Sequence, residues 1–216
     1  MLIIDNKIIE NEEDGIRNSL NYPVLRLLNK ENKFINLINK KIYEDILCFN
    51  YVSRQILSEY ELNILINILT EYIVTFNKNN IISIAIEFNQ FIGLNNISYI
   101  KSYNYDFNLE KEINLNDIFD KLIDYKKIII DSIKFQLSNI LECYETEIEY
   151  ELINFIQSIE IYDNQPFYIE SDGLVICFSS YEMGSSITSI IEFKLMYEDN
   201  INYFSDYFIS EILSKI

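Results

Sequence analysis

The chain has 216 residues, of which 49% are hydrophobic, so it can bury a core as one domain or two small ones. Its 17 basic and 34 acidic side chains give a net charge of −17, which repels phosphate and excludes nucleic acid as a partner. The same charge keeps a protein soluble, and it also suits the steering of a basic protein partner.

The first part of the chain predicts strands arranged around one long helix. An opening strand over 2–9 leads through an acidic turn to an extended segment at Pro23. Apolar residues then recur at every fourth position, which predicts an amphipathic helix from Phe34 to Leu47, and they are Phe34, Ile38, Ile42 and Ile46.

A hairpin and a further strand follow this helix. Runs over 71–76 and 81–91 flank the turn residues 77–80, and alternation in the second run predicts a half-buried strand. The segment 98–109 alternates again. We expect Tyr105 and Phe107 to share the core of the hairpin, while Asn104 and Asp106 point to solvent or to another layer.

The second part of the chain predicts helices before and after further strands. Capping side chains in 114–117 precede one amphipathic helix over 119–137, and further helices are predicted over 145–157 and 199–213. Because strands and helices mix without strict alternation, the predicted class is α+β, with helices packed on antiparallel sheet. We expect two halves, 1–110 and 111–216, packed as one structural unit.

The segment from Phe167 to Lys194 is the most informative motif. Two apolar runs flank Ser171-Asp172-Gly173, which predicts a tight turn between them. We expect Asp172 and Gly173 to adopt the positive φ that such a turn requires. The second run leads into a loop at Tyr181-Glu182, and another apolar run over 189–195 predicts a third strand. The arrangement predicts a hairpin, a loop and a strand in one short stretch.

Several kinds of chemistry are excluded by residue type. The absence of histidine excludes Ser-His-Asp and Cys-His catalysis and removes the imidazole metal ligands. The cysteines Cys48, Cys143 and Cys177 are odd in number and lie in apolar sequence, which predicts free thiols instead of a disulfide framework or a zinc site. We therefore expect no enzyme, no cofactor and no metal.

The segments 167–194, 72–83 and 102–119 together resemble the RsiV-like domain family, in the same order and over most of the chain. That domain occurs in a lysozyme-sensing anti-sigma factor and in the non-catalytic N-terminal part of a peptidoglycan deacetylase. The resemblance implies a recognition domain for a lysozyme-like protein or a cell-wall-related ligand. The chain differs from relatives in the loop at 92–96, where a histidine-containing loop is replaced, so no role of that histidine transfers.

The predicted binding residues lie in two loops, because loops on rigid sheets carry most binding contacts. They are Gly93, Asn95, Asn96, Tyr181 and Glu182. Two alternatives to the recognition domain remain open, namely an acidic immunity or inhibitor protein that binds a basic partner and a carboxylate-dependent hydrolase. No apolar run reaches the roughly 20 residues needed to span a bilayer, and no export signal precedes the first strand. The predicted location is therefore cytoplasmic, although family relatives are extracytoplasmic.

Overall fold

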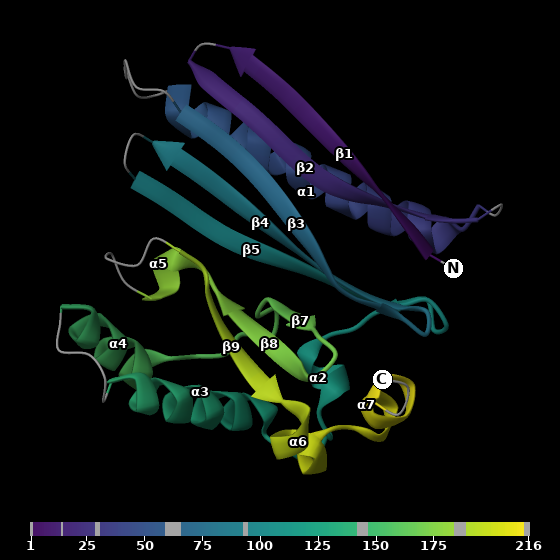
Figure 1. Ribbon diagram of the computed structural model, residues 1–216, viewed down its shortest axis with the longest axis vertical. Helices are drawn as coiled ribbons and strands as arrows, with labels where there is room; N and C mark the ends of the chain where they lie inside the picture. Colours follow the sequence, from purple (N-terminus) through teal and green to yellow (C-terminus); the bar gives the residue numbers. More distant parts are fainter. Residues whose placement is uncertain are drawn as a thin grey trace.

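The computed structural model describes residues 2–13, 15–28, 31–58, 66–92, 95–141, 147–183 and 189–213. Figure 1 shows a long twisted sheet with one helix on its far face, and a second, smaller sheet with helices beneath it. The class is α+β, as the sequence predicts. None of the helices in these ranges is long and apolar enough to cross a membrane.

The larger sheet consists of six strands in sequence order. All neighbours pair antiparallel except β2 and β3, which are parallel where residues 16–20 meet 66–70. The sequence predicts antiparallel pairing only, and the difference arises because a helix connects these two strands and returns the chain to the same end of the sheet. The strands are β1 Leu2–Glu13, β2 Ile16–Leu27, β3 Ile66–Lys78, β4 Ile81–Ile92, β5 Asn95–Asp106 and β6 Lys111–Glu112.

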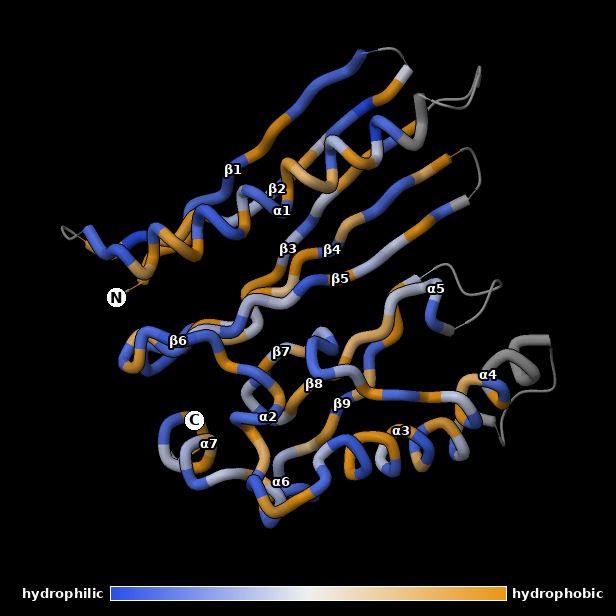
Figure 2. Tube along the Cα trace, turned by 180° about the vertical axis from the view of Figure 1, so that it is seen from behind, coloured by the Kyte–Doolittle hydropathy of each residue, from blue (hydrophilic) through white to orange (hydrophobic). Residues whose placement is uncertain are grey.

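The connecting helix, α1 (Lys33–Ser58), covers one face of this sheet. Apolar residues recur along it between polar ones (Figure 2), and Ile38, Ile42 and Ile46 are buried against the strands. It extends beyond the predicted end at Leu47. Tyr105 joins this core with the isoleucines of β4, as predicted, whereas Phe107 is only half-buried because β5 ends just before it.

The β3–β4 hairpin turns at Asn79 and Asn80, whose φ angles are 55° and 61°. Two consecutive residues with positive φ are typical of the hairpin turn whose twist matches that of the flanking strands. The pairing register shifts between Val74 and Phe76. This bulge turns Phe76 toward the second core, where it packs with Ile81 and the apolar residues of the smaller sheet.

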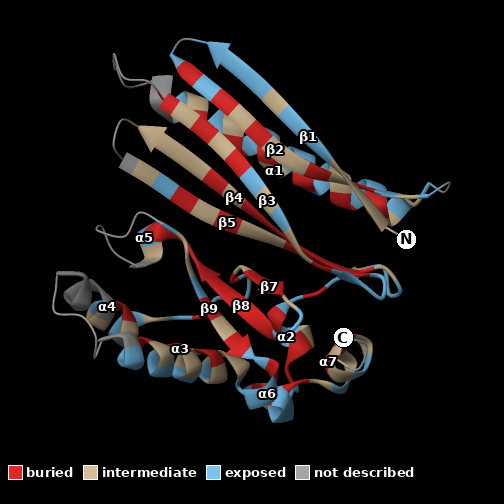
Figure 3. Ribbon diagram, viewed as in Figure 1, coloured by how far each residue is buried: buried red, intermediate tan, exposed pale blue. Residues whose placement is uncertain are grey.

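The smaller sheet has three antiparallel strands, and its central strand β8 is buried along its entire length (Figure 3). One face carries the helices, and the other faces the larger sheet through Tyr168, Val175 and Cys177. The remaining elements are α2 Leu115–Ile118, α3 Tyr125–Leu141, α4 Glu147–Ser158, β7 Phe167–Ile169, β8 Gly173–Phe178, α5 Ser180–Met183, β9 Ile191–Met196, α6 Tyr197–Asn200, the 3-10 turn Ile201–Tyr203 and α7 Asp206–Glu211.

Two of the predicted helices are broken. The segment 119–137 is not one helix, because Phe119 forms an isolated bridge with Phe204 and a new helix starts only at Tyr125. Leu122 would lie on the apolar side of the predicted helix over 119–137, but in the structure it is 95% exposed. The same bridge interrupts the predicted C-terminal helix, which restarts at Asp206 after the Ser205 cap. Contacts between distant segments thus override the local apolar periodicity.

The turn after β7 forms as predicted, but for a different reason. Neither Asp172 nor Gly173 has a positive φ among the described residues. A Cβ atom at Gly173 would instead lie 2.9 Å from the carbonyl oxygen of Leu195 and 2.8 Å from a side-chain carbon of Lys194. Glycine is required there because the neighbouring strand passes too close for any side chain.

The predicted half-buried strand is covered on both faces over its first half. Residues 81–86 of β4 are all buried, including Ser83, because β7 crosses the face opposite α1. Asn104 and Asp106 are likewise buried beneath the second layer. Ser83 donates to the Asn104 side chain at 2.6 Å, and Asn104 donates to the carbonyl oxygen of Phe167 at 2.8 Å. A polar interface therefore joins the two sheets.

Candidate functional site

The predicted binding residues fall at one end of β5. Gly93 lies outside the described residues, and Asn95 and Asn96 begin β5, where Asn96 is partly buried. Tyr181 and Glu182 lie in the short helix α5. The side chain of Asn95 is also outside the described part.

The structure places the start of the helix that carries Tyr181 and Glu182 against the strand that follows Asn96. The hydroxyl of Ser180 accepts a hydrogen bond from the backbone N–H of Ser98 at 3.3 Å and donates to its carbonyl oxygen at 3.1 Å. α5 therefore packs against the first residues of β5 (Figure 1). Segments that are more than 80 positions apart thus form one end of a single site.

Tyr181 and Glu182 have different roles within α5. The carboxylate of Glu182 accepts a hydrogen bond from the N–H of Ser179 at 2.6 Å, so it caps the helix on which it lies. Tyr181 is 70% exposed, and its ring forms part of the surface. Glu182 therefore stabilises the local backbone, whereas Tyr181 is available for contact.

A groove of about 480 Å³ runs from α5 along the outer edge of β5. Tyr99, Ile100 and Lys101 line one side, and the segment 162–166 with α5 lines the other. A smaller concavity of about 110 Å³ continues past Ser102 and Asn104 and shares Asn164 and Gln165 with it. We call the two together the β5 groove.

The wall opposite β5 is held by a buried glutamine. Gln165 donates to the carbonyl oxygen of Cys177 at 2.7 Å, and its side-chain oxygen accepts from the N–H of Tyr162 at 3.5 Å. Tyr162 is half exposed at the rim of the groove. Because the segment 162–166 is tied to β8, the groove has two rigid sides.

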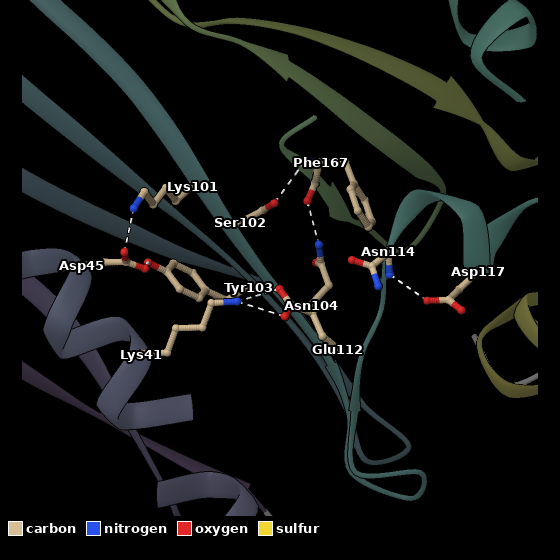
Figure 4. Close-up of polar contacts among 10 residues, drawn as sticks. All are labelled: Lys41, Asp45, Lys101, Ser102, Tyr103, Asn104, Glu112, Asn114, Asp117 and Phe167. Atoms are coloured by element: carbon tan, nitrogen blue, oxygen red, sulfur yellow. Dashed lines mark hydrogen bonds and ion pairs between the residues drawn. The ribbon is translucent and has the colours of Figure 1, made fainter. Parts of the chain in front are cut away.

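Side chains of β5 that face α1 form a linked polar group beside the groove (Figure 4). Lys101 pairs with Asp45 of α1 at 2.6 Å, and the hydroxyl of Tyr103 donates to the same carboxylate at 2.8 Å. Burial, together with the nearby Asp45 charge, raises the pKa of Tyr103, so this hydroxyl stays protonated and remains a donor. The charge of Lys101 is thus already paired.

A separate concavity of about 330 Å³ lies between the sheets. It is lined by three glutamates that were not among the predicted site residues. Glu71 and Glu87 are direct cross-strand neighbours, and Glu192 approaches from the smaller sheet. The pKa of Glu192 is raised, chiefly by loss of water around its carboxyl and also by the charge of Glu87. A hairpin without the bulge would not pair Glu71 with Glu87, so no signal in the sequence identifies this cluster.

Among the described residues, no group of three or more His, Cys, Asp or Glu side chains has the arrangement to hold a metal ion. Cys177 is buried, and burial raises the pKa of its thiol well above the ordinary value, which disfavours the nucleophilic thiolate. Cys48 is a free, exposed thiol. Cys143 lies outside the described residues.

Comparison with known proteins supports the fold. Residues 116–198 match a family described as "Protein of unknown function (DUF3298)". The chain is similar in structure to a DUF3298 family member from Bacteroides fragilis NCTC 9343, with 15% identity, a TM-score of 0.65 and coverage of 99% of this chain and 98% of that one.

A DUF3298 family protein from Pseudomonas aeruginosa PAO1 is also similar, with 12% identity, a TM-score of 0.64 and coverage of 95% of both chains. No curated protein matches the sequence. The C-terminal part thus carries a DUF3298 match, and the same architecture extends over nearly the entire chain. The closer resemblance to the RsiV-like domain stays a prediction.

Proposed function

We propose that this protein is a non-catalytic recognition domain that binds a basic protein partner in the β5 groove. The observation that carries the proposal is a rigid-sided groove with two exposed aromatic side chains, Tyr162 and Tyr181, at its rim. Tyrosine supplies a large contact area at a low cost in conformational entropy, and it is enriched in binding hot spots.

The charge of the chain favours a basic partner. In the groove, Lys101 is paired with Asp45, Glu112 with Lys41 and Asp163 with Lys126, and Glu182 adds a further acidic side chain. The net charge of −17 extends the same sign over the whole chain and would speed the approach of a cation-rich protein. The resemblance to the RsiV-like family points to a lysozyme-like protein, with a cell-wall fragment as the other ligand class, and an inhibitor of a basic enzyme would use the same groove.

Calorimetric titration of the purified chain with a basic lysozyme and with soluble peptidoglycan fragments tests this proposal. We expect Tyr162→Ala and Tyr181→Ala each to weaken binding at least about tenfold, the effect of losing about 1.4 kcal/mol. Tyr51→Ala is the matched control, because Tyr51 is 62% exposed on α1 away from the groove. No binding of either ligand class would overturn the proposal, as would equal loss in all three variants.

A second candidate function is carboxylate-dependent hydrolysis, and the glutamates between the sheets favour it. Acid and base roles need two carboxylates whose surroundings separate their pKa values, and Glu192 has a raised pKa beside Glu87. Incubation with peptidoglycan fragments, followed by chromatography of the products, tests this candidate. Product formation that is lost in Glu87→Gln and in Glu192→Gln would favour hydrolysis over recognition.

A further inference from the structure

We infer that the outer edge of β5 binds an extended segment of the basic partner as an added β-strand. This inference rests on the proposed recognition function and specifies its binding mode. Strand addition uses the backbone N–H and C=O groups of a sheet edge for affinity and the neighbouring pockets for specificity. Strand addition to β5 requires backbone groups that point outward and have no hydrogen-bond partner within the chain.

The direction of the β5 backbone groups follows from three hydrogen bonds. The N–H of Phe107 donates to the carbonyl oxygen of Asn80 at 2.8 Å, on the side of β4. In an antiparallel pair every second residue bonds to the same neighbour, so the odd-numbered residues of β5 face β4. The even-numbered ones face outward, as the bonds of Ser98 to Ser180 and of Asn104 to Ile113 confirm.

These two contacts close the ends of the β5 edge and leave its middle open. The carbonyl oxygen of Asn104 accepts from the N–H of Ile113 at 2.8 Å, and Ser98 is bonded to Ser180. Between them, the outward N–H and C=O groups of Ile100 and Ser102 have no hydrogen-bond partner in the described part of the chain. The open stretch, 99–103, is about 16 Å long at the usual rise per residue.

The edge is open because β6 stops after two residues. Asn114 and Asp117 form a capping box, in which the carboxylate of Asp117 accepts from the N–H of Asn114 at 2.9 Å (Figure 4). This box starts α2 and turns the chain away from β5. A strand bound beside Ile100 and Ser102 would lie where a longer β6 would run. It would therefore continue the antiparallel pairing of β5 with β6.

The second sheet does not cover this edge, because it is attached to the face of β5 instead. The side chains of Ser102 and Asn104 hold the backbone of Phe167, at 3.1 Å and 2.8 Å respectively (Figure 4). Their backbone groups therefore remain directed sideways into the β5 groove. Lysine or arginine in the added strand would lie beside Glu182 on a chain whose net charge is −17, while Glu112 and Asp163 are already paired with lysines, and this overall charge is why the occupant is a basic segment.

The direct test uses a capped heptapeptide of alternating lysine and valine and the full chain labelled with ¹⁵N. We expect saturating peptide to slow amide hydrogen exchange at Ile100 and Ser102 at least about tenfold, because strand pairing buries and bonds these groups. The outward amides of β1, the other edge strand of the sheet, serve as the internal control and should not change. Protection on β1 in place of β5 would overturn the inference.

Two N-methylated versions of the peptide provide a test that does not depend on any protein variant. Methyl groups on alternate backbone nitrogens block either the set that faces β5 or the set that faces away. We expect one version to lose at least about tenfold in affinity and the other to keep it, a difference of about 1.4 kcal/mol. Equal affinity of the two versions would show that the peptide does not bind as a strand.

A matched pair of variants tests the protein side. Ser102→Ala and Ser102→Pro both lose the hydroxyl that holds Phe167, but only proline removes the outward N–H, and this N–H is not used by β4. We expect Ser102→Pro to bind the peptide at least about tenfold more weakly than Ser102→Ala. If the proline variant does not fold, the N-methylated peptides decide the question alone.

The outcomes separate this inference from the proposed function. Binding of a basic lysozyme that depends on Tyr162 and Tyr181, without peptide binding or protection of Ile100 and Ser102, would overturn strand addition and leave the recognition function standing. Absence of binding by both probes would overturn both.

Discussion

The two faces of the six-stranded sheet are covered by different chemistry. The face under α1 is mainly apolar, with Phe88 fully buried against the rings of Phe49 and Tyr99, and its polar contacts to α1, such as those of Asp45, lie beside this core. The face under the smaller sheet carries a small apolar cluster around Tyr168 and Val175, and in addition Ser83 and Asn104 hydrogen-bond to each other and to the backbone of β7. Apolar packing is strong but non-directional, whereas a buried polar network specifies one relative position of its layers.

This difference explains how the β5 groove is kept open. Two sheets joined by apolar contacts alone would gain by sliding until the remaining edge was covered. The directional bonds of Ser102 and Asn104 to Phe167 instead hold the second layer on the face of β5 and leave the edge free. Substitutions on the two faces should therefore differ in size and in consequence.

The largest effect is expected on the apolar face. Phe88→Ala should lower the free energy of unfolding by about 3 to 5 kcal/mol, because it removes a fully buried ring and leaves a cavity. Chemical denaturation followed by circular dichroism measures this change. Phe135→Ala is the control, since Phe135 is 68% exposed on α3 and should change stability by less than about 0.5 kcal/mol. A loss below about 1 kcal/mol for Phe88→Ala would contradict the assigned register.

A smaller effect is expected on the polar face. Asn104→Ala should cost about 1 to 3 kcal/mol, because the carbonyl of Phe167 and the hydroxyl of Ser83 lose their partner in a buried site. Urea denaturation gives the value, and Asn11→Ala, at an exposed position of β1, is the control. If Asn104→Ala were neutral, the polar contact between the sheets would not determine how they pack.

A still smaller loss of stability is expected at the margin of the apolar face. Phe107→Ala should cost about 1 to 2 kcal/mol, less than a fully buried ring, because its side chain is half exposed beyond the end of β5. Thermal denaturation in parallel with Phe88→Ala compares the two positions directly. Equal destabilisation by both changes would mean that the core extends past the end of β5.

The smallest effect concerns Glu192 between the sheets and depends on pH. Its folded-state pKa is raised, mainly by partial loss of water, so the folded protein binds more protons than the unfolded one, and stability falls as the pH rises through the unfolded value toward the folded one. Glu192→Gln should therefore be more stable than the native chain at pH 7, with the difference fading below about pH 4. Urea denaturation across this range measures it, and Glu198→Gln on exposed α6 is the matched control. A variant less stable than the native chain at pH 7 would contradict this sign.

The sequence predicted elements that depend on local patterns. The four-residue spacing from Phe34 to Ile46 predicted α1, and the polar segment 77–80 predicted the hairpin turn, which the structure narrows to Asn79 and Asn80. The capping side chains in 114–117 predicted a helix start, and Asn114 does begin a helix, although this helix, α2, ends at Ile118 before the predicted one over 119–137. In each case the interactions concerned lie within a few residues, so the pattern contains the physical cause.

The sequence predicted only part of the candidate site that the structure shows. Tyr181 was assigned to the surface that now borders the β5 groove, but Tyr162 and the backbone of Ile100 and Ser102 were missed. An open sheet edge leaves no mark in side-chain periodicity, because it depends on where the neighbouring strand ends. Glu71 and Glu87 were missed for a similar reason, since the bulge near Val74 sets their pairing.

The sequence by itself determined the α+β class, the exclusion of histidine chemistry and the strands and helices whose stabilising contacts are local. Only the tertiary structure decided that Phe119 bridges Phe204, that Gly173 lies against Leu195 and that β5 keeps an open edge. These features depend on backbone groups brought together from distant positions in the chain. Their free energies come from hydrogen bonds and packing that no short window of residues contains.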